Sequence, residues 1–183
     1  MKSICIETYD IIIHPLRLID MPHLENIEND LYEILSNFEN TEYIPRRRPE
    51  NRDDLSNKIM GIILNYEKKL QYAHFITNKV TNKIIGMVDL ISPENAKKNY
   101  NLDEYDWVIE YFLHRNFWGQ GIMSGIISAI CQRLNEQGIQ TIAAICDRNN
   151  IGSIRVLEKN GFKNVKPFDF KQDYYLSKTE SPF

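Results

Sequence analysis

Cysteine and histidine are too few and too scattered in this sequence to build the sites that they usually build. Cysteine occurs three times in 183 residues, as Cys5, Cys131 and Cys146, and an odd, scattered set predicts neither a disulfide framework nor a zinc site. The four histidines also lack the spacing of metal ligands. We therefore expect a reduced protein that holds no metal.

Long apolar runs and an excess of positive charge are also missing. No run approaches the ~20 residues that cross a bilayer, and the first residues lack the apolar block and cleavage site of a signal peptide. A net charge of −3 provides no basic field for nucleic acid. We expect a cytoplasmic protein with no membrane or nucleic-acid partner, and the sequence leaves monomer and homodimer open.

The chain does contain enough apolar residues, 43% of the total, for one domain with a sizeable core over residues 1–183. Pro15 marks the first expected strand as an edge strand, and residues 92–106 are expected to form a long polar connection. The element order predicts an α+β fold with a mixed sheet. Hydrophobic periodicity predicts helices over residues 20–38, 53–70, 122–134 and 151–159, and strands over residues 9–18, 72–80, 84–91, 108–113, 140–146, 164–169 and 174–177.

The stretch over residues 106–138 organises the rest of the chain. It predicts a buried strand carrying one carboxylate, Glu110, then a turn with Gly119 and Gly121, then a helix with one broad apolar face. The first N–H groups of a helix have no intrahelical partner, and the helix dipole adds positive charge there. A glycine turn before such a helix therefore predicts an anion site.

Two other interpretations of the same glycines are open. Gly119 and Gly121 can simply make a tight turn. Alternatively, Gly119, Gly121 and Gly125 approximate a dinucleotide-binding fingerprint, with Asp147 after the next strand as the acid that binds ribose. That fold begins with this unit and continues with further strand–helix repeats, whereas one short helix and two strands follow Asp147 here.

A second motif lies one strand and one helix downstream. Its fixed positions follow the pattern Asn-x-x-Ser-x-x-x-x-Glu-Lys-x-Gly-Phe, carried by Asn150, Ser153, Glu158, Lys159, Gly161 and Phe162. Together with Trp118-Gly119-Gln120-Gly121, this motif resembles the GNAT superfamily of acetyl-CoA-dependent N-acetyltransferases, and within it the RimJ/RimL branch of ribosomal-protein N-acetyltransferases. Smaller resemblances extend over most of the chain, at Pro15-Leu16-Arg17, Ile85-Gly86 and Asp89.

The resemblance implies a GNAT fold, with a twisted sheet of about seven strands splayed at its centre and helices on both faces. It implies acetyl-CoA as co-substrate, with the pantetheine arm between the splayed strands and in contact with Asn150. Gly125 then serves helix packing, and a backbone N–H of Phe112 or Leu113 holds the oxyanion. The pyrophosphate would lie on the N–H groups of Phe117, Trp118, Gly119, Gln120, Gly121 and Ile122.

Two side chains are candidates for the chemistry. By resemblance, Ser153 donates a proton or hydrogen bond to the leaving thiolate; the alternative is a residue in the first turn of a helix that Asn150 caps. Glu110 is the candidate general base, because a carboxylate inside an apolar strand is costly unless it faces a cleft or a partner. The alternative for Glu110 is an acid on an exposed strand face.

The expected reaction is transfer of acetyl to a primary amine by direct attack in a ternary complex. The branch suggests a protein N-terminal amine as acceptor. A small-molecule amine, such as a polyamine or an amino-sugar antibiotic, is the alternative acceptor. A non-catalytic acyl-CoA-binding module is a third hypothesis. Arg46, Arg47 and Arg48 either reach the cofactor's 3′-phosphate or an acidic acceptor, or form a solvated loop. Asp103, Glu104 and Asp106 either attract a cationic amine to the acceptor site or form a solvated loop.

Overall fold

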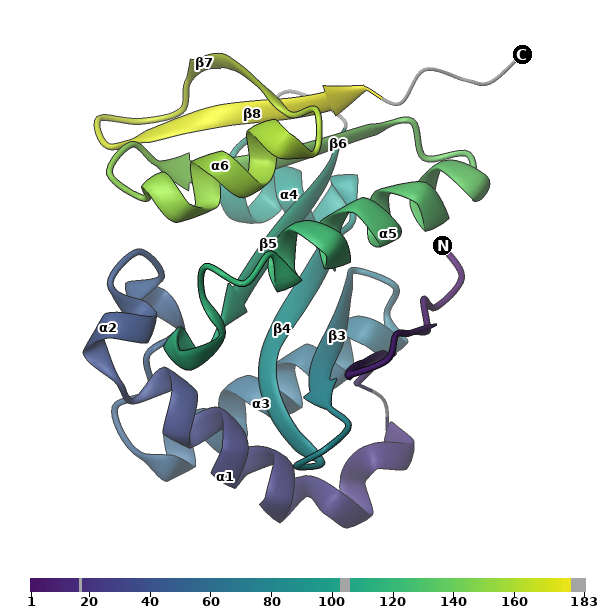
Figure 1. Cartoon of the computed structure of the whole chain (residues 1–183), viewed down its shortest axis with the longest axis vertical. Helices are drawn as coiled ribbons and strands as arrows, with labels where there is room; N and C mark the ends of the chain where they lie inside the picture. Colours follow the sequence, from purple (N-terminus) through teal and green to yellow (C-terminus); the bar gives the residue numbers. More distant parts are fainter. Residues whose placement is uncertain (17, 103–105, 179–183) are drawn as a thin grey trace. The chain divides into compact units, whose positions relative to one another are not determined.

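The computed structural model describes residues 1–16, 18–102 and 106–178 of the chain (Figure 1). Its strands are β1 Ile6–Glu7, β2 Ile11–Pro15, β3 Gln71–Asn78, β4 Lys83–Ile91, β5 Trp107–Leu113, β6 Thr141–Asp147, β7 Lys163–Pro167 and β8 Gln172–Lys178. Its α-helices are α1 Leu24–Leu35, α2 Phe38–Thr41, α3 Arg52–Glu67, α4 Pro93–Tyr100, α5 Ile122–Glu136 and α6 Ile151–Lys159, and short 3-10 helices are η1 Leu18–His23, η2 Pro45–Arg47 and η3 Arg115–Phe117.

The chain divides into two compact units, which we describe separately. The N-terminal unit comprises Ser3–Asp89 and Tyr111–Trp118. In it β2 pairs with β1 on one side and β3 on the other, both antiparallel. Helices α1 and α3 pack together because each has one apolar face, and these faces meet the sheet in one cluster. The cluster includes Leu31, Ile34, Ile59, Ile63, Phe75, Met87 and Phe112.

The C-terminal unit comprises Met1–Lys2, Leu90–Glu110 and Gly119–Phe183. In it β6 pairs in parallel with β5 and along its whole length, antiparallel, with β8, which also pairs with β7. Helix α4 contributes Ala96 to a buried cluster with Val108 of β5, Ala143 of β6 and Tyr174 of β8. In Figure 1, α6 lies on the near side of β8 and α4 on the far side, so helices cover both faces of this part of the sheet.

Among the described residues, the strands form one sheet of eight in the order β1-β2-β3-β4-β5-β6-β8-β7. Most neighbours are antiparallel, which confirms the α+β class and excludes the regular parallel repeats of a dinucleotide-binding fold. The eighth strand is β1, whose two residues are too short to give a sequence signal. Within the described part of the chain, no helix has the length and apolarity needed to cross a membrane.

Three expectations about elements were wrong. The strand with Pro15 is not an edge strand, because β1 pairs with its outer side through Ile6 and Ile13. Residues 92–106 are not a continuous loop, because Ser92 caps a helix by accepting a hydrogen bond from the Asn95 N–H (3.3 Å). Gly125 is not a packing glycine, since a Cβ built there meets no heavy atom within 4 Å.

Candidate active site

Glu110 lies on β5, between buried and half-buried neighbours of an apolar strand. Val108 and Ile109 are buried at 0% and 1% exposure and fix the strand in the sheet, while Glu110 itself is half-buried. Its carboxylate Oε1 accepts a hydrogen bond from the hydroxyl of Tyr100, the last residue of α4. Glu110 is therefore a half-buried carboxylate with a hydrogen-bond partner, and its role as the general base stays a prediction.

Glu110 and Ser153 belong to opposite faces of the sheet in the C-terminal unit. Val108 pairs with Ala143, so these two side chains share the face that α4 covers. Side chains alternate along a strand, which puts Glu110 on the same face as Val108, and Cys146, three residues after Ala143, on the other. Ser153 of α6 is hydrogen-bonded to the Cys146 side chain and therefore lies on that other face.

The pairing between β5 and β6 is short at this point. It joins Trp107 with Ile142 and Val108 with Ala143. Both strands continue beyond this ladder, β5 to Leu113 and β6 to Asp147, and no further β5–β6 pair is present among their described residues. The sheet is thus interrupted where Glu110 stands on one face and Cys146 with Ser153 on the other.

The glycine turn before α5 has the backbone geometry of an anion site. Gly119 and Gly121 have φ values of +73° and +76°, in the left-handed region that favours glycine. Gly121 is the N-cap of α5, and its carbonyl oxygen accepts the helix bond from the Gly125 N–H (3.0 Å). Gly119, Gln120 and Gly121 are exposed and Ile122 is half-buried, so the first N–H groups of α5 lie at the surface of this unit.

At the start of α6, Asn150 and Ser153 are held by helix capping. The Asn150 side chain accepts a hydrogen bond from the Ser153 N–H (3.1 Å), so its capping role is present, and the Ser153 hydroxyl is directed to Cys146 instead. Burial raises the pKa of the Cys146 thiol, and the hydrogen bond from Ser153 offsets part of this rise. Cys146 is therefore a neutral thiol at neutral pH and an inert neighbour of Ser153.

The other predicted cofactor residues lie in the N-terminal unit. Phe112 and Leu113 are buried at the end of β5, where the His114 N–H donates to the Ile85 carbonyl of β4 (2.7 Å). Gly86 permits this approach, because a Cβ there would collide with the Phe112 carbonyl oxygen and lie 3.1 Å from the Leu113 Cα. The resemblance noted at Gly86 thus has a steric cause.

Phe117 and Trp118 follow the end of β5 in the chain. The half-exposed Trp118 donates its indole N–H to the Leu113 carbonyl oxygen (2.6 Å), which ties the turn to β5. Phe117 is half-buried and meets the His114 ring edge to face. The Arg115 N–H before them donates to the Asn40 side chain of α2 (2.9 Å).

The arginine run does not form a solvated loop throughout. Arg47 makes an ion pair with Asp89, which is 1% exposed on β4. Arg48 donates to the Thr41 hydroxyl (2.9 Å) and stacks over Phe38 at 4.7 Å, whereas Arg46 is exposed.

Among the acids expected near an acceptor, Asp106 accepts a hydrogen bond from the Tyr174 hydroxyl (2.9 Å). Asp103 and Glu104 lie outside the described residues, as does Arg17.

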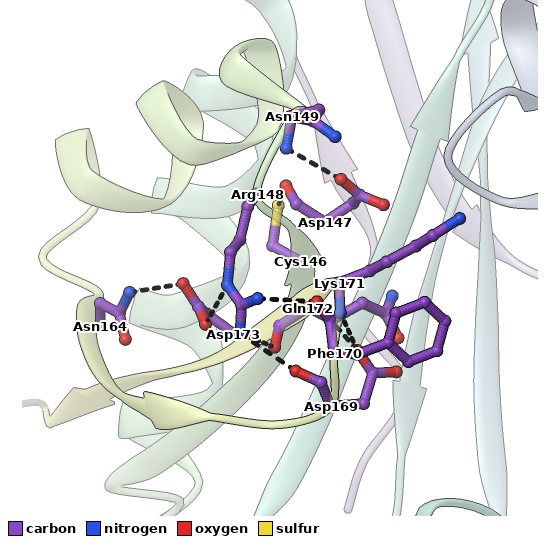
Figure 2. A network of polar contacts seen from close by, with 10 residues as sticks. All are labelled: Cys146, Asp147, Arg148, Asn149, Asn164, Asp169, Phe170, Lys171, Gln172 and Asp173. Atoms are coloured by element: carbon purple, nitrogen blue, oxygen red, sulfur yellow. Dashed lines mark hydrogen bonds and ion pairs between the residues drawn. The ribbon is translucent and has the colours of Figure 1, made fainter.

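A network centred on Arg148 supports the loop that leads into α6 (Figure 2). The Arg148 guanidinium bonds to Asp173 (2.8 Å) and donates to three carbonyl oxygens of the β7–β8 turn, those of Asp169, Phe170 and Gln172 (2.9–3.2 Å). The Arg148 N–H also donates to the Lys171 carbonyl oxygen (3.0 Å). The loop before Asn150 is therefore fixed to the adjacent hairpin.

The sequence alone did not predict three neighbours of the candidate site, which are Tyr100, Cys146 and Arg148. A signal for Tyr100 was present, since Ser92-Pro93-Glu94 is a typical helix start and would have replaced the expected loop by a helix ending at Tyr100. Arg148 had no comparable signal, because most of its partners are backbone carbonyls that any residues supply, and Asp173 lies 25 residues away in the sequence.

The profile of the acetyltransferase (GNAT) domain family matches residues 16–163. The chain therefore belongs to this family, and it is an N-acetyltransferase of the kind that takes acetyl from acetyl-CoA. The resemblance carried by the Asn150–Phe162 motif is confirmed. No curated protein sequence matches the chain.

Solved structures of acetyltransferases share the fold. RimL, a ribosomal L7/L12 alpha-N-protein acetyltransferase, superposes with a TM-score of 0.72 and 18% identity, covering 98% of this chain and 96% of its own. A GNAT-family acetyltransferase from Bacillus anthracis superposes with a TM-score of 0.70 and 17% identity, covering 96% of this chain and 98% of its own. AAC(6')-Ib in complex with paromomycin and acetyl-CoA superposes with a TM-score of 0.70 and 17% identity, covering 92% of this chain and 93% of its own. At this identity the likeness establishes the fold.

Proposed function

We propose that this chain transfers the acetyl group of acetyl-CoA to the α-amine of a protein N-terminus, by direct attack within a ternary complex. The observation that carries the proposal is the arrangement of Glu110 and Ser153 on opposite faces of an interrupted sheet. An amine approaching from the α4 face would meet the carboxylate, while a thioester on the α6 face would have the hydroxyl beside its sulfur.

The proposed step balances with these two groups. The amine nitrogen bonds to the acetyl carbon and the carbon–sulfur bond breaks. The proton lost by the nitrogen goes to the Glu110 carboxylate, and Ser153 donates a hydrogen bond to the thiolate, which then takes a proton from solvent. We propose that the N–H groups from Phe117 to Ile122 bind the pyrophosphate, that Asn150 contacts the pantetheine arm, and that an N–H of Phe112 or Leu113 binds the oxyanion.

The acceptor class is supported by acid–base arithmetic as well as by resemblance. An α-amine with a pKa of ~7.7–8.0 is roughly one-tenth neutral at pH 7, whereas a lysine amine with a pKa of ~10.4 is neutral in about one molecule in 2,500. A single carboxylate base suffices for the α-amine and gives the lysine amine little help. RimL, a protein α-N-acetyltransferase, is among the structural neighbours.

An amino-sugar acceptor is the second candidate, because the neighbour AAC(6')-Ib was solved with paromomycin. A panel of short peptides with free or blocked N-termini, polyamines and aminoglycosides separates the two, with release of CoA as the signal. Turnover only with free N-terminal peptides supports the proposal, and turnover only with amino sugars overturns it. Acetyl-CoA binding without CoA release across the panel would favour a non-catalytic binding module.

Variants test the two catalytic roles. Ser153→Ala and Glu110→Gln should each lower kcat by roughly a hundredfold or more, with acetyl-CoA binding retained. Matched controls are Ser128→Ala and Glu136→Gln, which change exposed residues of α5 and should leave kcat unchanged. Wild-type turnover in both site variants would refute the assigned roles.

We also propose that both compact units belong to one acetyltransferase domain. The matched family region, residues 16–163, includes most of each unit. Separate expression of residues 1–89 should give no folded acetyl-CoA-binding protein, because this fragment lacks the glycine turn and α5.

A further inference from the structure

The structure connects the candidate base to a residue outside the family motifs. The Tyr100 hydroxyl donates a hydrogen bond to Glu110 Oε1, and both residues lie in the C-terminal unit. We propose that Tyr100 is a positioning residue, which holds the Glu110 carboxylate in the orientation that removes a proton from the acceptor amine. This inference rests on the proposed function, because it assigns Tyr100 a part in the same proton transfer.

Helix α4 gives Tyr100 a fixed place from which to act. The helix begins at the Ser92 cap with Pro93 in its first turn, and it ends at Asn101, whose φ of 52° is left-handed. Ala96, at 0% exposure, anchors the helix in the cluster with Val108, two residues from Glu110 on the same face of β5. The half-buried Tyr100 ring packs against this cluster as well. The hydroxyl is thus carried by a rigid ring on an anchored helix end.

The chemistry of the pair fits a positioning role. A glutamate side chain has several rotatable bonds, and each orientation presents its oxygens differently to an approaching amine. A hydroxyl that donates to an ionised carboxylate makes a strong, directional bond. It therefore limits the rotation of the Glu110 carboxylate. Tyr100 itself need not touch the substrate.

Tyr100→Phe removes the hydroxyl and keeps the ring. We expect kcat to fall roughly tenfold to a hundredfold, the size expected when a charge-assisted hydrogen bond is lost. The KM for acetyl-CoA should stay within about twofold, because the variant leaves the turn before α5 unchanged. The matched control is Tyr174→Phe, which removes another tyrosine-to-carboxylate bond of the same unit, the one to Asp106. It should leave kcat near the wild-type value.

A double-mutant cycle separates positioning from a general structural effect. In the Glu110→Gln background, Tyr100→Phe should cause no further fall in kcat, because the carboxylate that it positions is gone. An equal fall in both backgrounds, or wild-type kcat in Tyr100→Phe, would overturn the inference. If Tyr100→Phe does not fold, Tyr100→Met, which also lacks a donor and keeps an apolar side chain, replaces it in the cycle. Absence of acetyl transfer by the wild-type protein would instead refute the proposed function.

Discussion

At the scale of single residues, His74 is a buried ionisable group of the N-terminal unit. It lies on β3 with 0% exposure, and its Nε2 accepts a hydrogen bond from the Ile4 N–H (3.4 Å). Burial lowers the pKa of His74 to about 4 from its ordinary value of 6.5, the nearby His14 adds to this fall, and the backbone of Tyr72 and Val88 only partly opposes it. The folded protein therefore keeps His74 neutral.

This burial predicts a pH dependence of stability. Between pH 6.5 and 4 the unfolded chain binds a proton at His74 that the folded chain does not, so the free energy of unfolding falls as pH falls through this window. The full loss is about 3 kcal/mol. Denaturant titrations should show that His74→Gln removes this part of the acid limb, while His23→Gln, at an exposed site, does not. An unchanged slope in His74→Gln, or an NMR titration of wild-type His74 near 6.5, would contradict the prediction.

At the scale of elements, the Arg148 network joins the β6–α6 loop to the β7–β8 turn (Figure 2). One guanidinium bonds to Asp173 and to three backbone carbonyls, a pattern that a lysine ammonium cannot reproduce. Asn150 and Ser153 follow this loop directly, so their placement depends on an anchor that lies outside both sequence motifs.

Arg148→Lys and Arg148→Met should therefore both loosen the turn. We expect a loss of roughly 1–2 kcal/mol of stability, since several modest hydrogen bonds disappear at a partly exposed site. Faster amide exchange at Phe168 and Lys171 should accompany a fall in kcat. Arg133→Met is the matched control, because Arg133 makes only an exposed ion pair with Glu136 among the contacts described for it. Exchange rates in Arg148→Met equal to those of the wild type would argue against an anchoring role.

At the scale of the whole molecule, the sequence predicted those elements whose ends carry their own signals. Helix α6 was placed with its observed bounds because Asn150 caps its start and Gly161, at φ +78°, follows its end. Helix α4 is the exception: Ser92-Pro93-Glu94 marks its start, but most of its residues are polar and only Pro93, Asn95 and Ala96 are buried, so it has little apolar periodicity.

The candidate site was predictable only in part. Glycine turns and helix caps are local, so Gly119, Gly121 and Asn150 could be found from sequence alone. The bond from Tyr100 to Glu110 joins the end of a helix to a strand, and the contact of Ser153 with Cys146 joins a helix to another strand. Both depend on how elements pack, which periodicity does not specify.

The anion site proposed before α5 predicts a ligand-dependent change in the stability of the whole chain. A ligand that binds only the folded state stabilises it by about 2.7 kcal/mol at a hundred times its Kd, which for a chain of 183 residues raises the Tm by roughly 5–10 °C. We expect CoA, which carries the pyrophosphate without the acetyl group, to produce such a shift in thermal scans of the wild type and of Ser153→Ala.

Two glycines at opposite ends of α5 make this test specific. Gly121 at the start and Gly138 after the end have similar φ values of +76° and +82°, and a Cβ at either meets no atom within 4 Å. Glutamate at either position should therefore cost a similar 1–2 kcal/mol of backbone strain. Only Gly121→Glu places a carboxylate beside the bound phosphates, so it should abolish the CoA-dependent rise in Tm. Gly138→Glu should lower the Tm of the free protein and keep the CoA-dependent rise. Equal shifts in the two variants would mean that the phosphates bind elsewhere, because backbone strain alone acts on the free and the CoA-bound protein alike.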